Sequence, residues 1–246
     1  MTPYYERNGI AIYQGDCLDV LPCLQPPVDM VLVDLPYGTT QCAWDIVIPF
    51  APMWEQVKRL VKPNAAIVMT GSQPFTSLLV ASNLGWFGYE WIWEKSVGTG
   101  YLDANRKPLK CHESVLVFYD KPPTYNPIKS PAAARTVKRS RPAGVYGNHK
   151  IAVTDNQGEA YPRSILYFSK ELGTVHRTQK PLALFSYLIA TYTNPGDLVL
   201  DFTMGSGTTL EAAKKLGRRA IGIDIDSLCC EQAARRLAQD VLPLAV

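Results

Sequence analysis

Residues 198–224 read LVLDFTMGSGTTLEAAKKLGRRAIGID, and this stretch decides the fold. The apolar runs Leu198–Leu200 and Ala220–Ile223 are predicted strands, and the amphipathic segment Leu210–Leu216 between them is a predicted helix. A strand, a glycine-containing turn, a helix and a second strand form a β-α-β unit. The sequence therefore predicts an α/β fold with a mostly parallel sheet.

The turn of this unit and the end of its second strand predict a ligand. Gly205 and Gly207 allow the backbone to approach a ligand closely, and Asp224 can accept hydrogen bonds from two ribose hydroxyls. The third glycine of a dinucleotide fingerprint is missing, because Leu210 stands there, and no lysine follows the glycines as in a P-loop. The pattern favours an adenosine without a pyrophosphate, so S-adenosylmethionine fits better than NAD or ATP.

A second strand end is predicted at residues 34–38, DLPYG, which follow the apolar run Met30–Val33. The Asp34 carboxylate can accept from an amino group, Pro36 stiffens the loop, and the Tyr37 ring can stack on a flat heterocycle. A plain turn explains the same five residues equally well. The rest of the chain has to decide between the two interpretations.

The order of these two segments constrains the fold. Only about forty residues follow the glycine turn, which is too few to complete a doubly wound domain. The remaining strands must therefore come from the N-terminal part of the chain. The catalytic-looking strand end precedes the cofactor-looking one.

A basic segment separates the two strand ends. Residues 121–180 contain eleven Lys and Arg and three Asp and Glu, a local excess of eight positive charges. Such a long basic segment favours contact with a polyanion, because neutralising phosphates drives nucleic-acid binding. Tyr125, Tyr146 and His149 are interleaved there and can stack against bases.

Composition narrows the remaining possibilities. The chain has a net charge of +3, an N-terminus without the apolar core of a signal peptide, and no apolar run of membrane-spanning length. We therefore expect a cytoplasmic protein with no membrane partner. The six cysteines form no C-x-x-C pair, so neither a metal site nor a disulfide framework is expected.

Five segments, taken in order, resemble an amino-group DNA methyltransferase of the beta arrangement, in which the catalytic half precedes the target-recognition region and the cofactor half. Together they cover nearly the whole chain. Residues 34–37 resemble the D-P-P-Y motif and residues 201–209 the D-P-F-x-G-S-G-T-T loop. The other matches are residues 176–181 with H-x-T-Q-K-P, residues 15–17 with G-D-C, and residues 91–95, 107–108 and 112–113 with the segment beside the flipped base.

The resemblance implies a Rossmann-like seven-stranded methyltransferase fold in permuted order, with an inserted DNA-recognition region. It predicts one domain over residues 1–246, with a catalytic half at 10–121, a basic insertion at 122–173 and a cofactor half at 174–240. The final hairpin of the sheet, which includes an antiparallel strand, is predicted at Tyr89–Glu94 and Ser114–Tyr119.

The resemblance also assigns residues to sites. The catalytic residues it implies are Asp34, Leu35, Pro36 and Tyr37. The cofactor residues are Asp16, Cys17, Thr178, Gln179, Lys180, Asp201, Phe202, Gly205, Ser206, Gly207, Thr208 and Asp224. The DNA contacts expected from the basic segment are Arg135, Lys138, Arg139, Arg141 and Lys150.

The implied reaction transfers a methyl group from S-adenosylmethionine to the N6 amino group of an adenine flipped out of duplex DNA. Leu35 replaces the first proline of the motif, but the resemblance implies that this position acts through its backbone carbonyl, and in that case the side chain is expected to be free to vary. N4-cytosine methylation, an RNA or protein glutamine substrate, and an inactive nucleic-acid-binding module are the alternatives. A homodimer and a cognate restriction endonuclease are candidate partners.

A few residues have simpler interpretations. Pro22-Cys23 is the dipeptide of cytosine-C5 enzymes, but we expect Cys23 to be a small core residue. Asp45 either supports the catalytic loop or caps a helix. His112 and Glu113 are expected to have a structural or base-pocket role, and Asp226 is expected to cap a last helix at Leu228–Ala238.

Overall fold

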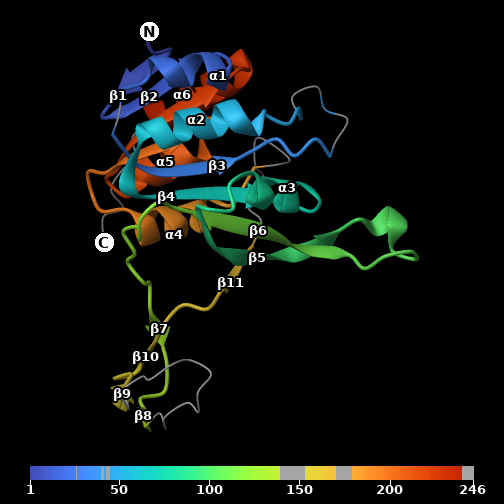
Figure 1. Cartoon of the computed structure of the whole chain (residues 1–246), viewed down its shortest axis with the longest axis vertical. Coiled ribbons are helices and arrows are strands. Elements are labelled where there is room, and N and C mark those ends of the chain that lie inside the picture. The colour runs from blue at the N-terminus through green and yellow to red at the C-terminus, as the bar shows by residue number, and fades with distance from the viewer. Residues whose placement is uncertain (26, 40–41, 43–44, 139–152, 170–178, 240–246) are drawn as a thin grey trace. The chain divides into compact units, whose positions relative to one another are not determined.

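The structure is a computed structural model that describes the chain except residues 26, 40–41, 43–44, 139–152, 170–178 and 240–246 (Figure 1). The chain forms two compact units. The main unit contains residues 1–126 and 164–246, and the smaller unit contains residues 127–163. The smaller unit lies within the predicted insertion at 122–173.

The main unit is built on a nine-stranded sheet in the order β1-β2-β13-β12-β3-β4-β6-β5-β11. Its strands in chain order are β1 (Tyr5–Arg7), β2 (Ile10–Gln14), β3 (Val28–Asp34), β4 (Val61–Gly71), β5 (Phe87–Thr99), β6 (Lys110–Phe118), β11 (Ile165–Phe168), β12 (Leu198–Asp201) and β13 (Arg219–Asp224). The seven expected strands form the centre. Strand β1 extends one edge antiparallel to β2, and β11 extends the other edge parallel to β5.

The β-α-β unit predicted from residues 198–224 is present. Helix α5 (Thr208–Lys215) connects β12 to β13, and these two strands are parallel neighbours. The C-terminal pair lies between two N-terminal strands, because β13 pairs with β2 and β12 pairs with β3. All four strands are parallel, so Asp34, Asp201 and Asp224 lie at the same edge of the sheet. The permuted order thus brings the two predicted strand ends together.

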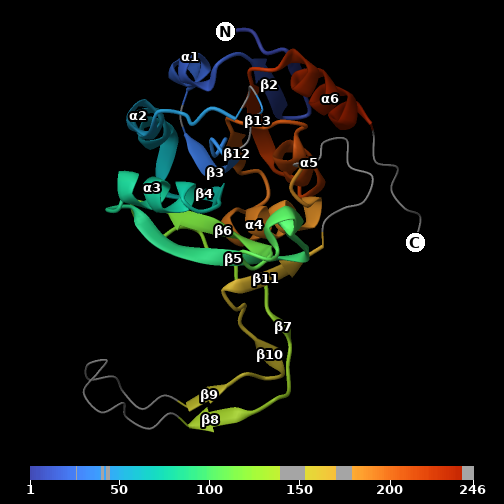
Figure 2. The same cartoon turned by 90° about the vertical axis from the view of Figure 1, so that its right-hand side faces the viewer.

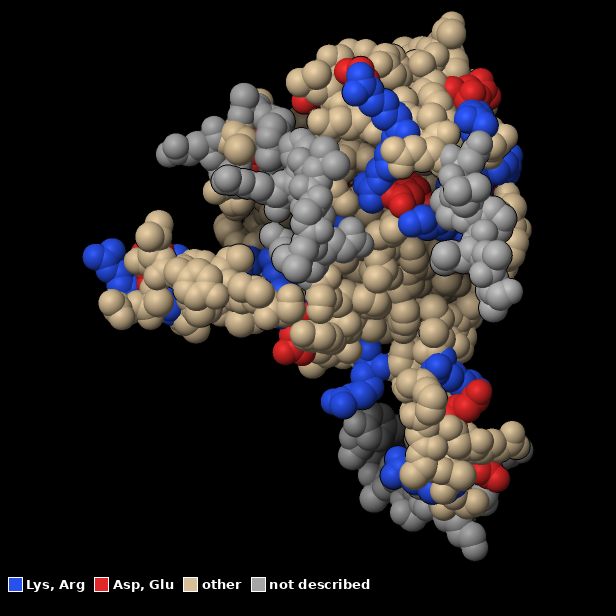
Figure 3. Space-filling view, turned by 180° about the vertical axis from the view of Figure 1, so that it is seen from behind, with Lys and Arg blue, Asp and Glu red and all other residues tan. Residues whose placement is uncertain are grey.

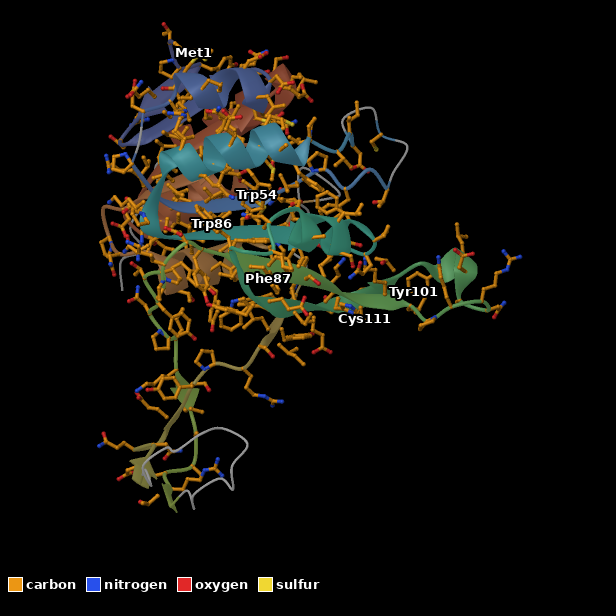
Figure 4. All side chains as sticks on the ribbon, in the orientation of Figure 1. Met1, Trp54, Trp86, Phe87, Tyr101 and Cys111 are labelled. Carbon is orange, nitrogen blue, oxygen red and sulfur yellow. The ribbon has the colours of Figure 1, made fainter. Side chains whose placement is uncertain are left out.

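The predicted final hairpin is confirmed. Strand β6 runs antiparallel to both β4 and β5, and Trp91 of β5 lies opposite Val115 of β6. The hairpin extends beyond the rest of the sheet as an arm, and Tyr101 lies near its far end in the 3-10 turn η2 (Tyr101–Asp103) (Figure 4). At the opposite end of β5, Trp86 and Phe87 lie near Trp54. The Trp54 and Phe87 rings both contact Phe118.

Helices cover both faces of the sheet (Figures 1 and 2). One face is packed against α1 (Cys17–Val20), α2 (Phe50–Leu60) and α3 (Phe75–Ser82). The other is packed against α4 (Leu182–Tyr192), α5 and α6 (Ser227–Ala238). Alternate residues of β3 point to the two faces, since Val31 and Val33 belong to the first core and Met30 and Leu32 to the second. A strand buried on both faces explains the continuous apolar run before Asp34.

Two small predictions can be compared with the structure. Asp226 caps α6 as expected, because its side chain accepts a hydrogen bond from the Leu228 N–H at 2.9 Å. The expectation for Cys23 is wrong, since this residue is exposed. It ends the 3-10 turn η1 (Leu21–Cys23), where a short helical turn presents it to solvent although its neighbours Leu21 and Leu24 are buried. None of the six cysteines, all of which lie among the described residues, is joined in a disulfide bond.

The described part of the smaller unit contains two short antiparallel ribbons. Strand β7 (Ser130–Pro131) pairs with β10 (Glu159–Ala160), and β8 (Thr136–Lys138) pairs with β9 (Val153–Asp155). The Asn156 side chain braces the unit, since it accepts from the Arg135 N–H at 2.8 Å and donates to the Ala133 carbonyl at 3.1 Å. Over the described part of the whole chain, no helix combines the length and apolar character needed to cross a bilayer.

Candidate functional site

Asp34 is the last residue of β3, and its carboxylate is held from three sides. Oδ1 accepts hydrogen bonds from the Tyr37 hydroxyl at 2.8 Å and from the Thr70 hydroxyl. Oδ2 accepts from the Lys180 ammonium at 2.5 Å. Thr70 pairs with Asp34 in the β3–β4 ladder, which explains why the two side chains meet. The carboxylate is therefore fixed in one orientation at the sheet edge.

Tyr37 has both a ring contact and a polar contact in this site. Its ring packs against Phe75 with the centroids 5.2 Å apart, and its hydroxyl lies 3.0 Å from Thr70 Oγ1 as well as contacting Asp34. Burial raises the pKa of the Tyr37 phenol well above its usual value, and the charges of Asp34 and Glu113 raise it further. Tyr37 is thus a neutral hydrogen-bond donor to Asp34.

Asp45 supports the catalytic loop, which is the first of the two roles considered for it. Its buried carboxylate accepts from the Gly38 N–H at 2.8 Å and from the Thr39 N–H at 2.9 Å. Two charge-assisted hydrogen bonds to consecutive backbone donors fix the turn that follows Tyr37. A rigid turn at this point keeps Asp34 and Tyr37 in place.

The Leu35 side chain is not free to vary, contrary to expectation. It is only 4% exposed and belongs to the core between the sheet and helices α1–α3. The side chain therefore contributes apolar packing, while the rigidity of the loop comes from Pro36 and from the bonds to Asp45. Packing, and not only the backbone carbonyl, constrains which residue can stand here.

Lys180 contacts the predicted catalytic residue Asp34. Besides its bond to Asp34, its ammonium is 3.4 Å from Glu113 Oε2. Burial lowers the pKa of Lys180, but the charges of Asp34 and Glu113 outweigh this effect, and the net pKa is raised above its usual value. Lys180 is therefore charged at neutral pH. Resemblance alone assigned it to the cofactor.

The glycine loop after β12 is joined to both strand ends. The Gly205 N–H donates to Asp224 Oδ2 at 2.8 Å, and the Thr203 hydroxyl donates to the Asp34 backbone carbonyl at 3.1 Å. The Asp201 carboxylate accepts from the Thr203 N–H at 3.1 Å and from the Thr209 hydroxyl. The loop is thus braced from inside by Asp201 and connected directly to the catalytic strand.

Asp201 makes a pH-dependent contribution to stability. Burial raises its pKa to about 7, although hydrogen bonds from Thr209 and Thr203 oppose the rise. Between about pH 4 and pH 7 the folded state then binds more protons than the unfolded state. The stability that the protonated Asp201 contributes to the folded state is therefore lost as the pH rises through 7. We expect Asp201→Asn to gain stability relative to the wild type, by about 2 to 4 kcal/mol, as the pH rises from 5 to 8. Urea denaturation at several pH values measures this difference, and a constant difference across the range would contradict it.

Other predicted cofactor residues surround the same loop. The Ser206 hydroxyl donates to Gln179 Oε1 at 3.3 Å, and the Gly15 N–H donates to the Asp224 carbonyl at 2.9 Å. Asp16 caps α1, which begins at the buried Cys17. Phe202 and Thr208 are buried, and Thr178 lies outside the described residues.

Three features of the loop and its surroundings are compatible with an adenosine-containing cofactor. Gly205 and Gly207 both have positive φ, and apart from the chain neighbours of Gly205 no atom of the described residues lies within 4 Å of the position that a Gly205 side chain would occupy. Open space beside Gly205 leaves room for a ligand, and the Asp224 carboxylate at the end of β13 is a hydrogen-bond acceptor for hydroxyl groups. The residues present therefore fit S-adenosylmethionine.

The predicted DNA contacts fall in the smaller unit. Arg135 is exposed there, and Lys138 ends β8, whereas Arg139, Arg141 and Lys150 lie outside the described residues. On the rear face of the main unit, basic and acidic side chains lie next to each other (Figure 3). The role of the basic segment in DNA binding stays a prediction.

Sequence reasoning missed Thr70 and the partners of Lys180 and Thr203. Thr70 was hidden because it lies within the apolar run of β4, and only the strand register places it beside Asp34. Glu113 was named with a structural or base-pocket role, and the structure places it between Lys95 and Lys180. Thr70 could have been found from the sequence as a polar residue within an apolar run that is typical of a buried strand.

Comparison with known proteins identifies what this arrangement resembles. A family model described as DNA methylase matches residues 28–235. The type II methyltransferase M1.MboII of Moraxella bovis is 27% identical over 250 residues, which cover 90% of this chain and 94% of that protein. The type II methyltransferase M.HpaI of Haemophilus parainfluenzae is 29% identical, over 85% of this chain and 68% of that protein.

Solved structures agree with these sequence relatives. The M1.HpyAVI complex with S-adenosylmethionine is 25% identical, with a TM-score of 0.64, and the match covers 92% of this chain and 98% of that one. The PvuII cytosine-N4-specific DNA methyltransferase has a TM-score of 0.71 at 16% identity, over 98% of this chain and 90% of that one. At that identity the second likeness supports the fold alone.

Proposed function

The chain belongs to the family of N6/N4 DNA methylases, which use S-adenosylmethionine, and we propose that it methylates the N6 amino group of an adenine flipped out of a specific site in duplex DNA. The observation that supports this most is the direct connection between Asp34 and the glycine loop. Thr203 of the loop donates to the backbone carbonyl of Asp34 at 3.1 Å. The predicted acceptor for the target and the predicted cofactor loop are thus parts of one site.

The target amino nitrogen is a poor nucleophile, so catalysis requires the enzyme to hold it by hydrogen bonds in a reactive geometry. The lone pair of an exocyclic amino nitrogen is delocalised into the base, so the nitrogen must be pulled toward tetrahedral geometry. The Asp34 carboxylate and the Leu35 backbone carbonyl each accept a hydrogen bond from one of its two N–H groups, and these bonds direct the lone pair. Positioning and electrostatics then supply most of the rate enhancement, without a covalent enzyme intermediate.

Each half of the site has its own task. S-adenosylmethionine, when bound, supplies a methyl group activated by its sulfonium sulfur. Gly205, Gly207 and Asp224 hold its adenosine portion, and Tyr37 stacks on the flipped base. Asp34 would keep its hydrogen bond to the amino group while the N–C bond forms and the S–C bond of the sulfonium breaks, which leaves a neutral thioether; the extra proton on the nitrogen would then leave to solvent. Duplex DNA must open locally for this, because the amino group is not accessible within the stack.

The basic segment is the proposed DNA-recognition region, with Arg135, Lys138, Arg139, Arg141 and Lys150 as contacts to phosphates or bases. The relatives named above are type II methyltransferases, so we also propose that the enzyme protects its sites from a cognate restriction endonuclease. Whether it acts as a monomer or a homodimer is measured by ultracentrifugation on the active enzyme.

Incubation with labelled S-adenosylmethionine and duplex DNA, RNA or protein tests the proposal. We expect label in duplex DNA alone. Nucleoside mass analysis of that DNA should then find N6-methyladenine. Label in RNA or protein, or none in any substrate, would refute a DNA methyltransferase, and N4-methylcytosine would refute the adenine target.

A further inference from the structure

Four charged side chains of alternating sign form a chain that ends at the catalytic carboxylate. Lys95 of β5 pairs with Glu113 of β6, the Glu113 carboxylate lies 3.4 Å from Lys180, and Lys180 pairs with Asp34 at 2.5 Å. The side chains of Lys95, Glu113 and Lys180 are only 10%, 13% and 9% exposed, and that of Asp34 is 29% exposed. We call this set the charge chain.

The charge chain is costly as a device for stability alone. Removing charges from water costs free energy that their mutual attraction often fails to recover, so buried ion pairs are weak evidence of stabilisation. Within the described residues, Glu113 Oε2 is buried and has no hydrogen-bond partner, although it faces Lys180. We therefore explain the position of this Glu113 oxygen by its effect on the orientation of Lys180, and not by a contribution to stability.

The two oxygens of Asp34 differ in what they can still accept. Oδ1 already accepts from the Tyr37 and Thr70 hydroxyls, which use both of its lone pairs. In the described contacts Oδ2 accepts only from Lys180, so it has capacity for one further donor. Lys180 thus fixes the oxygen that has a free lone pair.

We propose that Lys180, oriented by Glu113 and Lys95, is a positioning residue that presents Oδ2 of Asp34 to the target amino group. This inference rests on the proposed methyltransferase function. Lys180 also follows Gln179, which bonds to Ser206 of the glycine loop at 3.3 Å. One short segment therefore connects the cofactor loop to the orientation of the catalytic carboxylate.

The test compares Lys180→Met, Lys180→Arg, Glu113→Gln and the double variant Lys180→Met/Glu113→Gln. For each, the single-turnover rate of methyl transfer is measured with saturating DNA and S-adenosylmethionine, and cofactor affinity is measured by calorimetry. Lys62→Met is the matched control. Lys62 also pairs with an aspartate of β3, but this aspartate is Asp29, which lies near the opposite end of the strand from Asp34. Circular dichroism and urea denaturation verify that each variant is folded.

We expect Lys180→Met to slow transfer by about 100-fold with cofactor affinity within about threefold of the wild type. Lys180→Arg should transfer the methyl group at least about tenfold faster than Lys180→Met, because arginine keeps the positive charge. Glu113→Gln should slow transfer by about tenfold alone and add little in the double variant, because it acts through Lys180. Lys62→Met should stay within about twofold of the wild type.

Two results would overturn the inference while leaving the methyltransferase function intact. One is a loss of cofactor affinity in Lys180→Met with a normal rate at saturation, which would make Lys180 a cofactor ligand. The other is an additive loss in the double variant. If Lys180→Met fails to fold, the Glu113→Gln variant tests the inference instead. A normal rate of methyl transfer by Glu113→Gln would then refute it. A wild type that methylates no DNA would instead refute the proposed function.

Discussion

Replacing Asp34 with alanine should lower the single-turnover rate of methyl transfer by about 1,000-fold or more, while S-adenosylmethionine affinity stays within about threefold. The substitution removes the carboxylate that we propose accepts from the target amino group, and it leaves the buried Lys180 ammonium without its nearest partner. The glycine loop retains Asp201 and Asp224, which hold it from the other side. Rapid-quench kinetics and calorimetry measure the two quantities.

Asp34→Asn and Asp29→Asn complete this experiment. Asp34→Asn keeps the shape of the side chain and should also lose most of the activity, which separates a chemical effect from a loss of folding. Asp29 lies on the same strand and pairs with Lys62, so Asp29→Asn should retain most of the activity. Substantial turnover by Asp34→Ala would exclude this residue as the catalytic acceptor.

Replacing Gly207 with alanine should lower the free energy of unfolding by about 2 to 4 kcal/mol and weaken S-adenosylmethionine binding by about tenfold or more. Gly207 has a φ of +80°, and an added Cβ would lie 2.8 Å from the Ala233 Cβ of α6. Both the left-handed backbone conformation and the steric clash with Ala233 make an alanine at position 207 unfavourable. Since Gly207 caps α5 and ends the cofactor loop, relief of the clash must move the loop.

Two further variants separate these contributions. Gly217 also has a positive φ, of +69°, but in the part of the chain that the structure describes nothing beyond its chain neighbours lies within 4 Å of its Cβ position. Gly217→Ala should therefore cost only about 1 kcal/mol and leave cofactor binding unchanged. Ala233→Gly removes the clashing methyl group, so the double variant Gly207→Ala/Ala233→Gly should be more stable than the two single effects predict. Strict additivity would show that the clash is not the cause.

Much of the fold was predictable because it depends on local patterns. Apolar runs that end in acids located β3 and β13, and glycines followed by an amphipathic segment located the turn and helix α5. The cap at Asp226 was predictable for the same reason, since its partner is two residues away. The edge strand β11 was missed, because its four residues carry a signal too short to distinguish from a loop.

The polar network of the site was less predictable because its partners are distant in sequence. Lys180 and Asp34 are 146 residues apart, and Thr70 and Asp34 are 36 apart. A motif shows which side chain stands at a strand end, but the strand register and the packing of helices decide what it meets. Leu35 illustrates the same limit, since the motif showed a substitution and only the three-dimensional packing showed its burial.

The position of β12 and β13 between β2 and β3 has a consequence for synthesis of the protein. While the chain is being made, β2 and β3 each expose an edge whose partner strand, β13 or β12, lies more than 160 residues further along the chain. Open strand edges are the surfaces on which chains associate wrongly. The nascent protein therefore carries these two open edges until residues 198–224 have been made, and only then can Asp34 and the glycine loop come together.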